Sequence, residues 1–217
     1  MESVIHTHLI KISIFLVMIQ MTEHLNAQSF EFIYSTSQDE SIYEVIQDEK
    51  DSYYLILNQG TFPSLYNPLL IKIDSLGNFV KSQSVNSLLN NVFVGKNCLK
   101  WNDSLFVTTG IATDSITGLQ GLYFLSFDSS FNYLNEKLIS FSTQNLYAAR
   151  IRLLSDYSLL VGGSMIDNAS FDYQFYMLKL HHLDSIKNIY IYGQPNQNET
   201  LTDFLIFPDN SGYLLFT

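Results

Sequence analysis

From residue 29 onward, short apolar runs alternate with clusters of glycine, asparagine, aspartate and serine. The 3.6-residue spacing of an amphipathic helix is hard to find anywhere in this part of the chain. Short apolar or alternating runs that are bounded by turn-forming residues are typical of β-strands. The hydrophobic pattern therefore predicts an all-β structure.

The predicted strands recur at a regular interval. Four segments that open with aspartate and continue into an apolar run begin at Asp51, Asp103, Asp156 and Asp209, which are 52, 53 and 53 residues apart. Each period yields four predicted strands. These are 43–46, 53–57, 69–73 and 79–83; 97–101, 105–109, 122–127 and 133–139; 150–154, 159–161, 175–180 and 189–192; and, in a shorter fourth unit, 204–207 and 213–215. Four strands in a period of roughly fifty residues are typical of a β-propeller blade, whose apolar face is covered by the next blade.

A turn motif marks the third connection of each unit. Its copies are Ile73–Phe79, Phe127–Tyr133 and Leu183–Ile189, each with Asp-Ser, two variable residues and Asn. Asp and Ser side chains accept hydrogen bonds from turn amides, and Gly or Asn tolerates a left-handed backbone. We therefore expect the same turn in each unit. The repeated aspartates are interpreted as turn residues rather than as a calcium site or an acid–base site.

The segment Asp156–Gly163, which leads into Tyr176–Leu180, resembles the kelch-like and delta-60-type propeller repeats of secreted bacterial proteins. The resemblance covers about residues 29–217. It departs from kelch repeats because the first two units lack paired glycines and the later tryptophan is missing. It implies a β-propeller of four-stranded antiparallel blades, with about three complete blades plus a partial fourth, but no functional residue. The blade repeats are expected at about 37–85, 92–140, 145–193 and 199–217.

Residues 1–28 are interpreted as an export signal peptide. Lys11 precedes the apolar stretch Ile12–Ile19, which is too short to span a bilayer, and a polar segment follows. We expect cleavage after Ala27 or Gln28, and the end of the segment resembles secretory signals of Bacteroidetes. A buried N-terminal helix and an uncleaved anchor remain alternatives. The predicted location is extracellular, either secreted or at the surface of a bacterial cell.

Both ends of the mature sequence suggest a larger ring. Residues 30–34 have the composition of an outer strand that would close a propeller by completing its last blade. The fourth unit ends at Thr217, before its third strand. We therefore expect the chain to be the N-terminal part of a longer propeller, with the remaining blades missing from this sequence.

Composition narrows the class of partner. The sequence has 14 tyrosines and 16 phenylalanines against 4 prolines, which favours strands, and its formal net charge is −10. Such a charge repels phosphate backbones and anionic lipids, so nucleic acid and peripheral membrane binding are not expected. Cys98 is the single cysteine, so it cannot form an intrachain disulfide. Its place in a predicted strand favours a packed side chain over a reactive thiol.

No residue pattern predicts catalysis or a cofactor. His181 and His182, with Asp184 close behind, are the nearest approach to a metal site, because two imidazoles and a carboxylate can bind zinc. Adjacent residues on a strand point to opposite faces, however, so we expect an exposed turn insertion and no metal. Dinucleotide, P-loop and serine-hydrolase motifs are absent from the sequence. Trp101, near a predicted turn, is interpreted as a packing residue.

The sequence leaves two functions open. The first is a secreted or cell-surface module that binds a protein or glycan through loops at one face of the ring, without chemistry of its own. The alternative is the N-terminal part of a propeller-fold glycan hydrolase or lyase, whose active site would lie in the central funnel.

Overall fold

The computed structural model describes residues 32–34, 38–47, 52–60, 66–87, 89–183, 185–193, 198–207 and 212–216. The chain divides into two compact units, Met1–Ile33 and Tyr34–Thr217, and the fold described below is that of the second. The expected signal peptide, residues 1–28, lies outside the described residues. Within the described part of the chain, no helix is long and apolar enough to cross a membrane.

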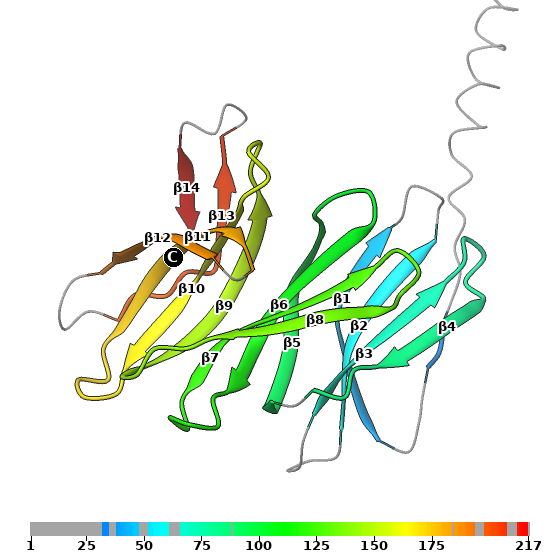
Figure 1. Ribbon diagram of the computed structural model, residues 1–217, viewed down its shortest axis with the longest axis horizontal. Helices are drawn as coiled ribbons and strands as arrows, with labels where there is room; N and C mark the ends of the chain where they lie inside the picture. Colours follow the sequence, from blue (N-terminus) through cyan, green and yellow to red (C-terminus); the bar gives the residue numbers. More distant parts are fainter. Residues whose placement is uncertain are drawn as a thin grey trace, which may run out of the picture. The chain divides into compact units, whose positions relative to one another are not determined.

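The second unit is built from antiparallel sheets whose strands follow one another along the chain (Figure 1). The first sheet contains β1 (Asp39–Gln47), β2 (Tyr53–Gly60), β3 (Asn67–Ile73) and β4 (Phe79–Ser84). The second contains β5 (Asn90–Lys100), β6 (Leu105–Thr113), β7 (Gln120–Asp128) and β8 (Tyr133–Ile139). The third contains β9 (Gln144–Leu153), β10 (Leu159–Asp167), β11 (Tyr173–His182) and β12 (Ser185–Tyr192). A two-stranded sheet of β13 (Asp203–Ile206) and β14 (Tyr213–Phe216) follows.

Each predicted strand overlaps an observed strand, so the all-β prediction is confirmed, as is the grouping of the first twelve strands into fours. Several strands are longer than predicted. Strands β6 and β10, for example, continue past Gly110 and Gly163. A Cβ atom on either glycine would lie 2.0 Å from a carbonyl oxygen of the neighbouring strand, that of Phe93 or Tyr147. Glycine is required at both positions because the backbones approach so closely.

Central strands are buried on both faces. In β7, Leu122 and Phe124 belong to the apolar cluster shared with the third sheet, whereas Tyr123, Leu125 and Phe127 belong to the cluster shared with the first sheet. Successive side chains of a strand point to opposite faces, so this alternation places β7 between two apolar layers. The strand therefore reads as a nearly continuous apolar run rather than as an alternating one.

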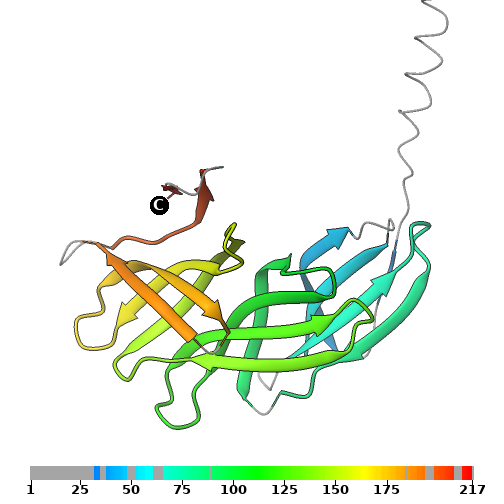
Figure 2. The same cartoon turned by 45° about the horizontal axis from the view of Figure 1, so that its top comes forward.

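The first strand of each sheet makes most of the contacts to the sheet before it. Strand β5 contacts β1, β2 and β3, β9 contacts β5, β6 and β7, and β13 contacts β9. The last strands are far more exposed, and every residue of β12 except Tyr192 is exposed. Figure 2 shows the four strands of each large sheet side by side. The sheets thus share buried faces near their first strands.

The expected turn is confirmed in the first two sheets. The Asp74 carboxylate accepts hydrogen bonds from the backbone N–H groups of Leu76 (2.9 Å) and Asn78 (2.8 Å). Asp128 accepts the equivalent bond from the N–H of Asn132 at 2.8 Å. The left-handed position is Gly77 in the first copy, at φ 84°, and Phe131 in the second, at φ 66°.

The third copy of the motif forms a different connection, so the expectation of one shared turn is wrong there. Strands β11 and β12 stay paired as far as His182 and Ser185, and Asn188 lies in the strand opposite Lys179. The two histidines extend β11 beyond the position where the other sheets turn, which moves the turn along the chain. Asp184 lies outside the described residues.

The expected closing strand at residues 30–34 is not observed in its described part, because residues 32–34 belong to no strand. A closing strand needs a partner with free backbone groups. The strand was predicted to complete the last blade of a longer ring, and the described residues do not test that pairing.

Candidate binding site

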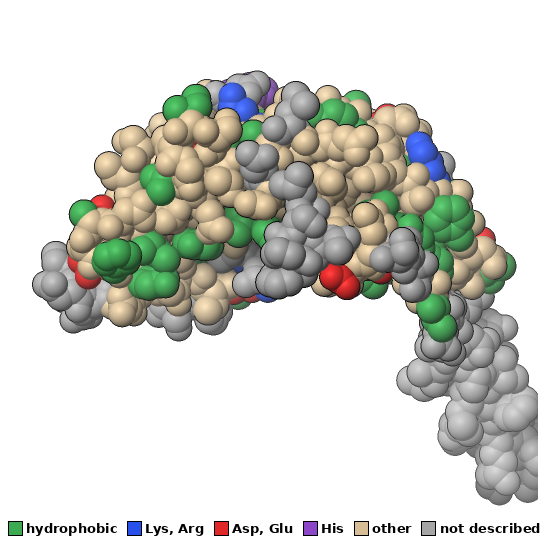
Figure 3. All heavy atoms as spheres, turned by 90° about the horizontal axis from the view of Figure 1, so that it is seen from below, with side chains coloured by type: hydrophobic (Ala, Val, Ile, Leu, Met, Phe, Trp, Pro, Cys, Tyr) green, Lys and Arg blue, Asp and Glu red, His purple; other side chains and the backbone are tan. Residues whose placement is uncertain are grey.

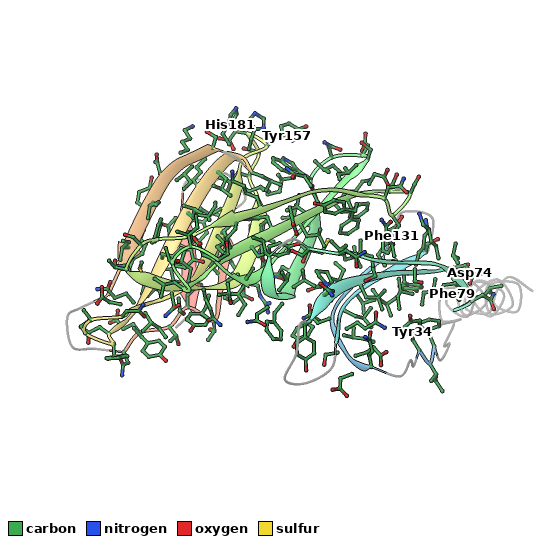
Figure 4. The ribbon with its side chains drawn as sticks, turned by 60° about the horizontal axis from the view of Figure 1, so that its bottom comes forward. Tyr34, Asp74, Phe79, Phe131, Tyr157 and His181 are labelled. Carbon is green, nitrogen blue, oxygen red and sulfur yellow. The ribbon has the colours of Figure 1, made fainter. Side chains whose placement is uncertain are left out.

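A hollow of about 340 Å³ lies where three turns of the second and third sheets meet. Its walls come from the β5–β6 turn, the β9–β10 turn and the end of β11. The lining residues are Trp101, Asn102, Leu105, Asp156, Tyr157, His181, His182 and Leu183. Figure 4 shows His181 and Tyr157 next to each other at this end of the sheets.

Trp101 links the two sheets at the hollow. The turn that carries it is held by Asn102, whose side-chain oxygen accepts hydrogen bonds from the N–H groups of Ser104 and Leu105, both at 3.0 Å. The half-buried indole packs against the apolar cluster between the sheets. Its Nε1 donates a hydrogen bond of 2.9 Å to the carbonyl oxygen of Tyr157. The prediction of a packing role is confirmed, but Trp101 also lines the hollow.

Tyr157 holds an unusual backbone conformation. Its φ is 59°, in the left-handed region that bulky residues rarely occupy, and its side chain is 67% exposed. The turn is closed by a hydrogen bond of 3.0 Å from its N–H to the carbonyl oxygen of Leu154. A left-handed residue other than glycine costs about 1–2 kcal/mol, and burial of the ring does not offset this cost. Such strain clusters at functional sites.

Asp156 has little capacity to donate a proton. Its carboxylate accepts a hydrogen bond from the Ser158 hydroxyl and forms an ion pair of 2.9 Å with Lys179. The Ser158 hydrogen bond, followed by that of Lys179, holds the pKa of Asp156 well below its usual value. A general acid needs a pKa near the working pH. This carboxylate instead stays ionised and is neutralised by its lysine partner.

The two histidines lie on the same side of the sheet, so our expectation that they point to opposite faces is wrong. A register irregularity between Leu180 and His182 interrupts the alternation of side chains in β11. Their ring centroids are 4.5 Å apart, and the His182 ring lies 6.4 Å from that of Trp101. Both imidazoles are exposed and line the hollow.

Within the described part of the chain, the two histidines are not joined by a third metal ligand. Among the residues that the structure describes, no group of three or more His, Cys, Asp and Glu side chains is arranged to hold a metal ion. Asp184, the third residue that we considered, lies outside the described residues. Structural zinc sites have four protein ligands and catalytic ones have three.

Cys98 behaves as the sequence predicts, as a packed residue. It lies against the apolar cluster between the first and second sheets. Burial raises the pKa of its thiol well above the ordinary value, and the negative charge of Glu44 raises it further. A reactive cysteine requires a lowered pKa, so the thiol is not a candidate nucleophile.

A second hollow, of about 310 Å³, lies along the first strands and is mostly apolar. It is lined by Tyr43, Phe93, Val94, Gly110, Ile111, Tyr147 and Ala148. The adjacent Asn58 side chain bonds to both backbone groups of Val94, donating at 2.7 Å and accepting at 2.9 Å. These bonds brace the first sheet against the second. We favour the first hollow as a binding site because it combines exposed aromatic and polar side chains.

Sequence reasoning missed Tyr157 as a site residue. The signal was present, because a large aromatic residue occupies a short Asp-x-Ser turn where glycine or asparagine is usual.

Figure 3 shows one face of the molecule, on which charged side chains are sparse and hydrophobic ones form separate patches. No protein-family model matches the sequence, and no curated protein is significantly similar to it.

Proposed function

We propose that the chain is part of a secreted or cell-surface β-propeller module that binds a protein or a glycan and performs no chemistry of its own. The observation that carries this proposal is the hollow formed by turns of neighbouring sheets, with Tyr157 exposed at its rim. Turn residues on a rigid scaffold are common sites of binding.

The propeller part of the proposal is supported by how the sheets pack. Three four-stranded antiparallel sheets follow one another along the chain, and the first strand of each later sheet contacts the sheet before it. Propeller blades are four-stranded sheets arranged around an axis that their first strands line. The resemblance of Asp156–Gly163 to kelch-like repeats favours the same architecture.

The non-catalytic part is supported by the state of Asp156. Among the described residues that line the hollow it is the only carboxylate, and it is ion-paired with Lys179. A glycosidase requires two carboxyl groups flanking the bond that is cleaved, one of them able to donate a proton. The described lining of this hollow offers no such pair to a glycan hydrolase or lyase, whose active site we expected in the central funnel.

Two measurements test the proposal. Expression of the chain with its own N-terminus in a bacterium should release a protein whose first residue is Gln28 or Ser29, as determined by mass spectrometry. Retention of an intact Met1 form in the cytoplasm would contradict secretion. Incubation with a panel of polysaccharides should leave them uncleaved. Cleavage that is abolished by a single aspartate or glutamate substitution would support the enzyme instead.

A further inference from the structure

We infer that the hollow binds the pyranose ring of a neutral sugar, which stacks on Tyr157 and is hydrogen bonded by Asn102, His181 and His182. This inference rests on the proposed function, because it specifies the ligand of a binding module.

The lining matches the two surfaces of a sugar. A pyranose presents a flat apolar face of C–H groups and a rim of hydroxyls. The Tyr157 ring supplies an exposed aromatic surface, and the Trp101 indole lies in the same hollow. Imidazole and amide side chains form hydrogen bonds with hydroxyls. Ligand sites combine apolar walls with a few convergent polar groups in this way.

Volume favours a small ligand. The hollow holds about 340 Å³, which is near the lower end of the range of about 300–1,000 Å³ for small-molecule sites. That space suits one or two sugar rings at the end of a glycan. A protein partner would need a much larger contact surface to bind stably.

The charge of the site favours a neutral sugar over an acidic one. Asp156 and Lys179 neutralise each other at the rim through an ion pair of 2.9 Å. The whole chain carries a formal net charge of −10, which repels uronates, sialic acids and phosphorylated ligands. The remaining polar side chains in the lining are an amide and two imidazoles.

Backbone strain with an exposed ring sets Tyr157 apart from Phe131, and its place in the hollow sets it apart from Phe171, which shares both features. Phe131 has a similar left-handed backbone, at φ 66°, but its ring is fully buried. Tyr157 holds the same conformation with its ring open to solvent, where packing does not explain the choice of an aromatic residue. Its carbonyl oxygen accepts a hydrogen bond from Trp101, so the backbone that carries the ring is held in place before any ligand arrives. A rigid aromatic anchor loses little freedom on binding.

The experiment uses the single tryptophan as a reporter. Because Trp101 lines the hollow and is the only tryptophan in the chain, sugar binding should change the intrinsic fluorescence in a saturable way. The full chain is titrated with glucose, galactose, mannose and N-acetylglucosamine and with oligosaccharides that end in them. We expect at least one of these probes to bind, and Tyr157→Ala to raise its Kd at least tenfold.

Phe171 supplies a matched control. It has the same φ of 59° and an exposed ring (73%), but it belongs to the β10–β11 turn at the other end of the third sheet. Phe171→Ala should leave the Kd unchanged. Tyr157→Asn gives a second variant that tolerates the left-handed backbone, so loss of binding is separated from loss of folding. The His182→Ala variant should also weaken binding, by a smaller factor.

Each outcome bears on one of the two claims. Failure of every sugar to bind, or binding that Tyr157→Ala leaves intact, overturns the sugar site while the binding module stands. If the chain binds a protein but no sugar, and Tyr157→Ala abolishes that binding, the sugar site is likewise overturned while the binding module stands. Turnover of a bound sugar overturns the non-catalytic function but supports the location of the site.

Discussion

Phe131 provides the sharpest test of how the sheets are joined. It lies in the turn between β7 and β8 at φ 66°, yet its ring is fully buried between the first and second sheets. The ring stacks on Tyr54 at a centroid distance of 4.9 Å and meets Phe127 edge-on at 5.2 Å. The equivalent turn of the first sheet has Gly77 at this position. A turn residue of one sheet thus fills the boundary with its neighbour.

The expected magnitude follows from burial and strain together. Truncation of a buried phenylalanine to alanine costs about 3–5 kcal/mol, so Phe131→Ala should lower the unfolding free energy by that amount. Alanine keeps the left-handed strain of about 1–2 kcal/mol, and glycine relieves it. Glycine loses about 0.5–1 kcal/mol through its greater freedom in the unfolded chain. Phe131→Gly should therefore be at least as stable as Phe131→Ala.

Phe127 is the matched control, because it is equally buried in the same cluster but lies in the extended strand β7. There we expect the ordinary order, with Phe127→Gly less stable than Phe127→Ala by about 0.5–1 kcal/mol. Urea unfolding followed by far-ultraviolet circular dichroism measures all four variants. A loss below about 1 kcal/mol in Phe131→Ala, or the same order of alanine and glycine at both positions, would refute the reasoning.

Three further predictions use the same unfolding assay. Gly163→Ala should cost about 3 kcal/mol, because the new Cβ would lie 2.0 Å from the carbonyl oxygen of Tyr147. Asn58→Leu should cost about 3 kcal/mol, since it removes both buried hydrogen bonds to Val94. The unfolding free energy should fall as the pH drops below about 4, the ordinary pKa of aspartate, because the folded pKa of Asp156 is lowered and its stabilisation is lost on protonation. Asp156→Asn should reduce this fall.

Each of these predictions has its own contrary result. Gly118→Ala, at φ 74° with open space around it, should cost only about 1–2 kcal/mol. An equal loss of stability in Gly163→Ala would mean that the nearby Tyr147 carbonyl adds no cost. An unchanged stability of Asn58→Leu would mean that the bonds to Val94 contribute nothing between the sheets. An acid dependence equally steep in Asp156→Asn and in the parent chain would place the titrating groups elsewhere.

The strands were predictable because their signals are local. An apolar run such as Leu122–Phe127 and the turn residues that bound it lie within a few positions of each other. The first two copies of the Asp-Ser turn were predictable for the same reason, since the hydrogen bonds of Asp74 and Asp128 stay within their own turns. The conformation of such strands and turns is therefore determined mainly by neighbouring residues and not by distant parts of the chain.

The register of a strand depends on its partner, and here local reasoning failed. The irregularity between Leu180 and His182 arises from pairing with β12, so the sequence of β11 alone suggested opposite faces for the two histidines. The same pairing extends the strand past the place where the other sheets turn. The candidate site was missed for this reason: its histidines, Trp101 and Tyr157 come from three turns that only the packing of two sheets brings together.

Three aromatic turn residues, Phe131, Tyr157 and Phe171, hold a left-handed backbone that conflicts with local preference. In a sequence whose local and global preferences agree, a left-handed turn position carries glycine or asparagine, as it does at Gly77. Phe131 breaks this rule and is compensated by full burial of its ring. Tyr157 and Phe171 break it with exposed rings, so burial compensates neither, and of these two Tyr157 is the one that lines the hollow. Burial of its ring assigns Phe131 to stability, whereas the proposed binding role of Tyr157 rests on its place in the hollow. Phe131→Ala should therefore lower the unfolding free energy, and Tyr157→Ala should weaken sugar binding.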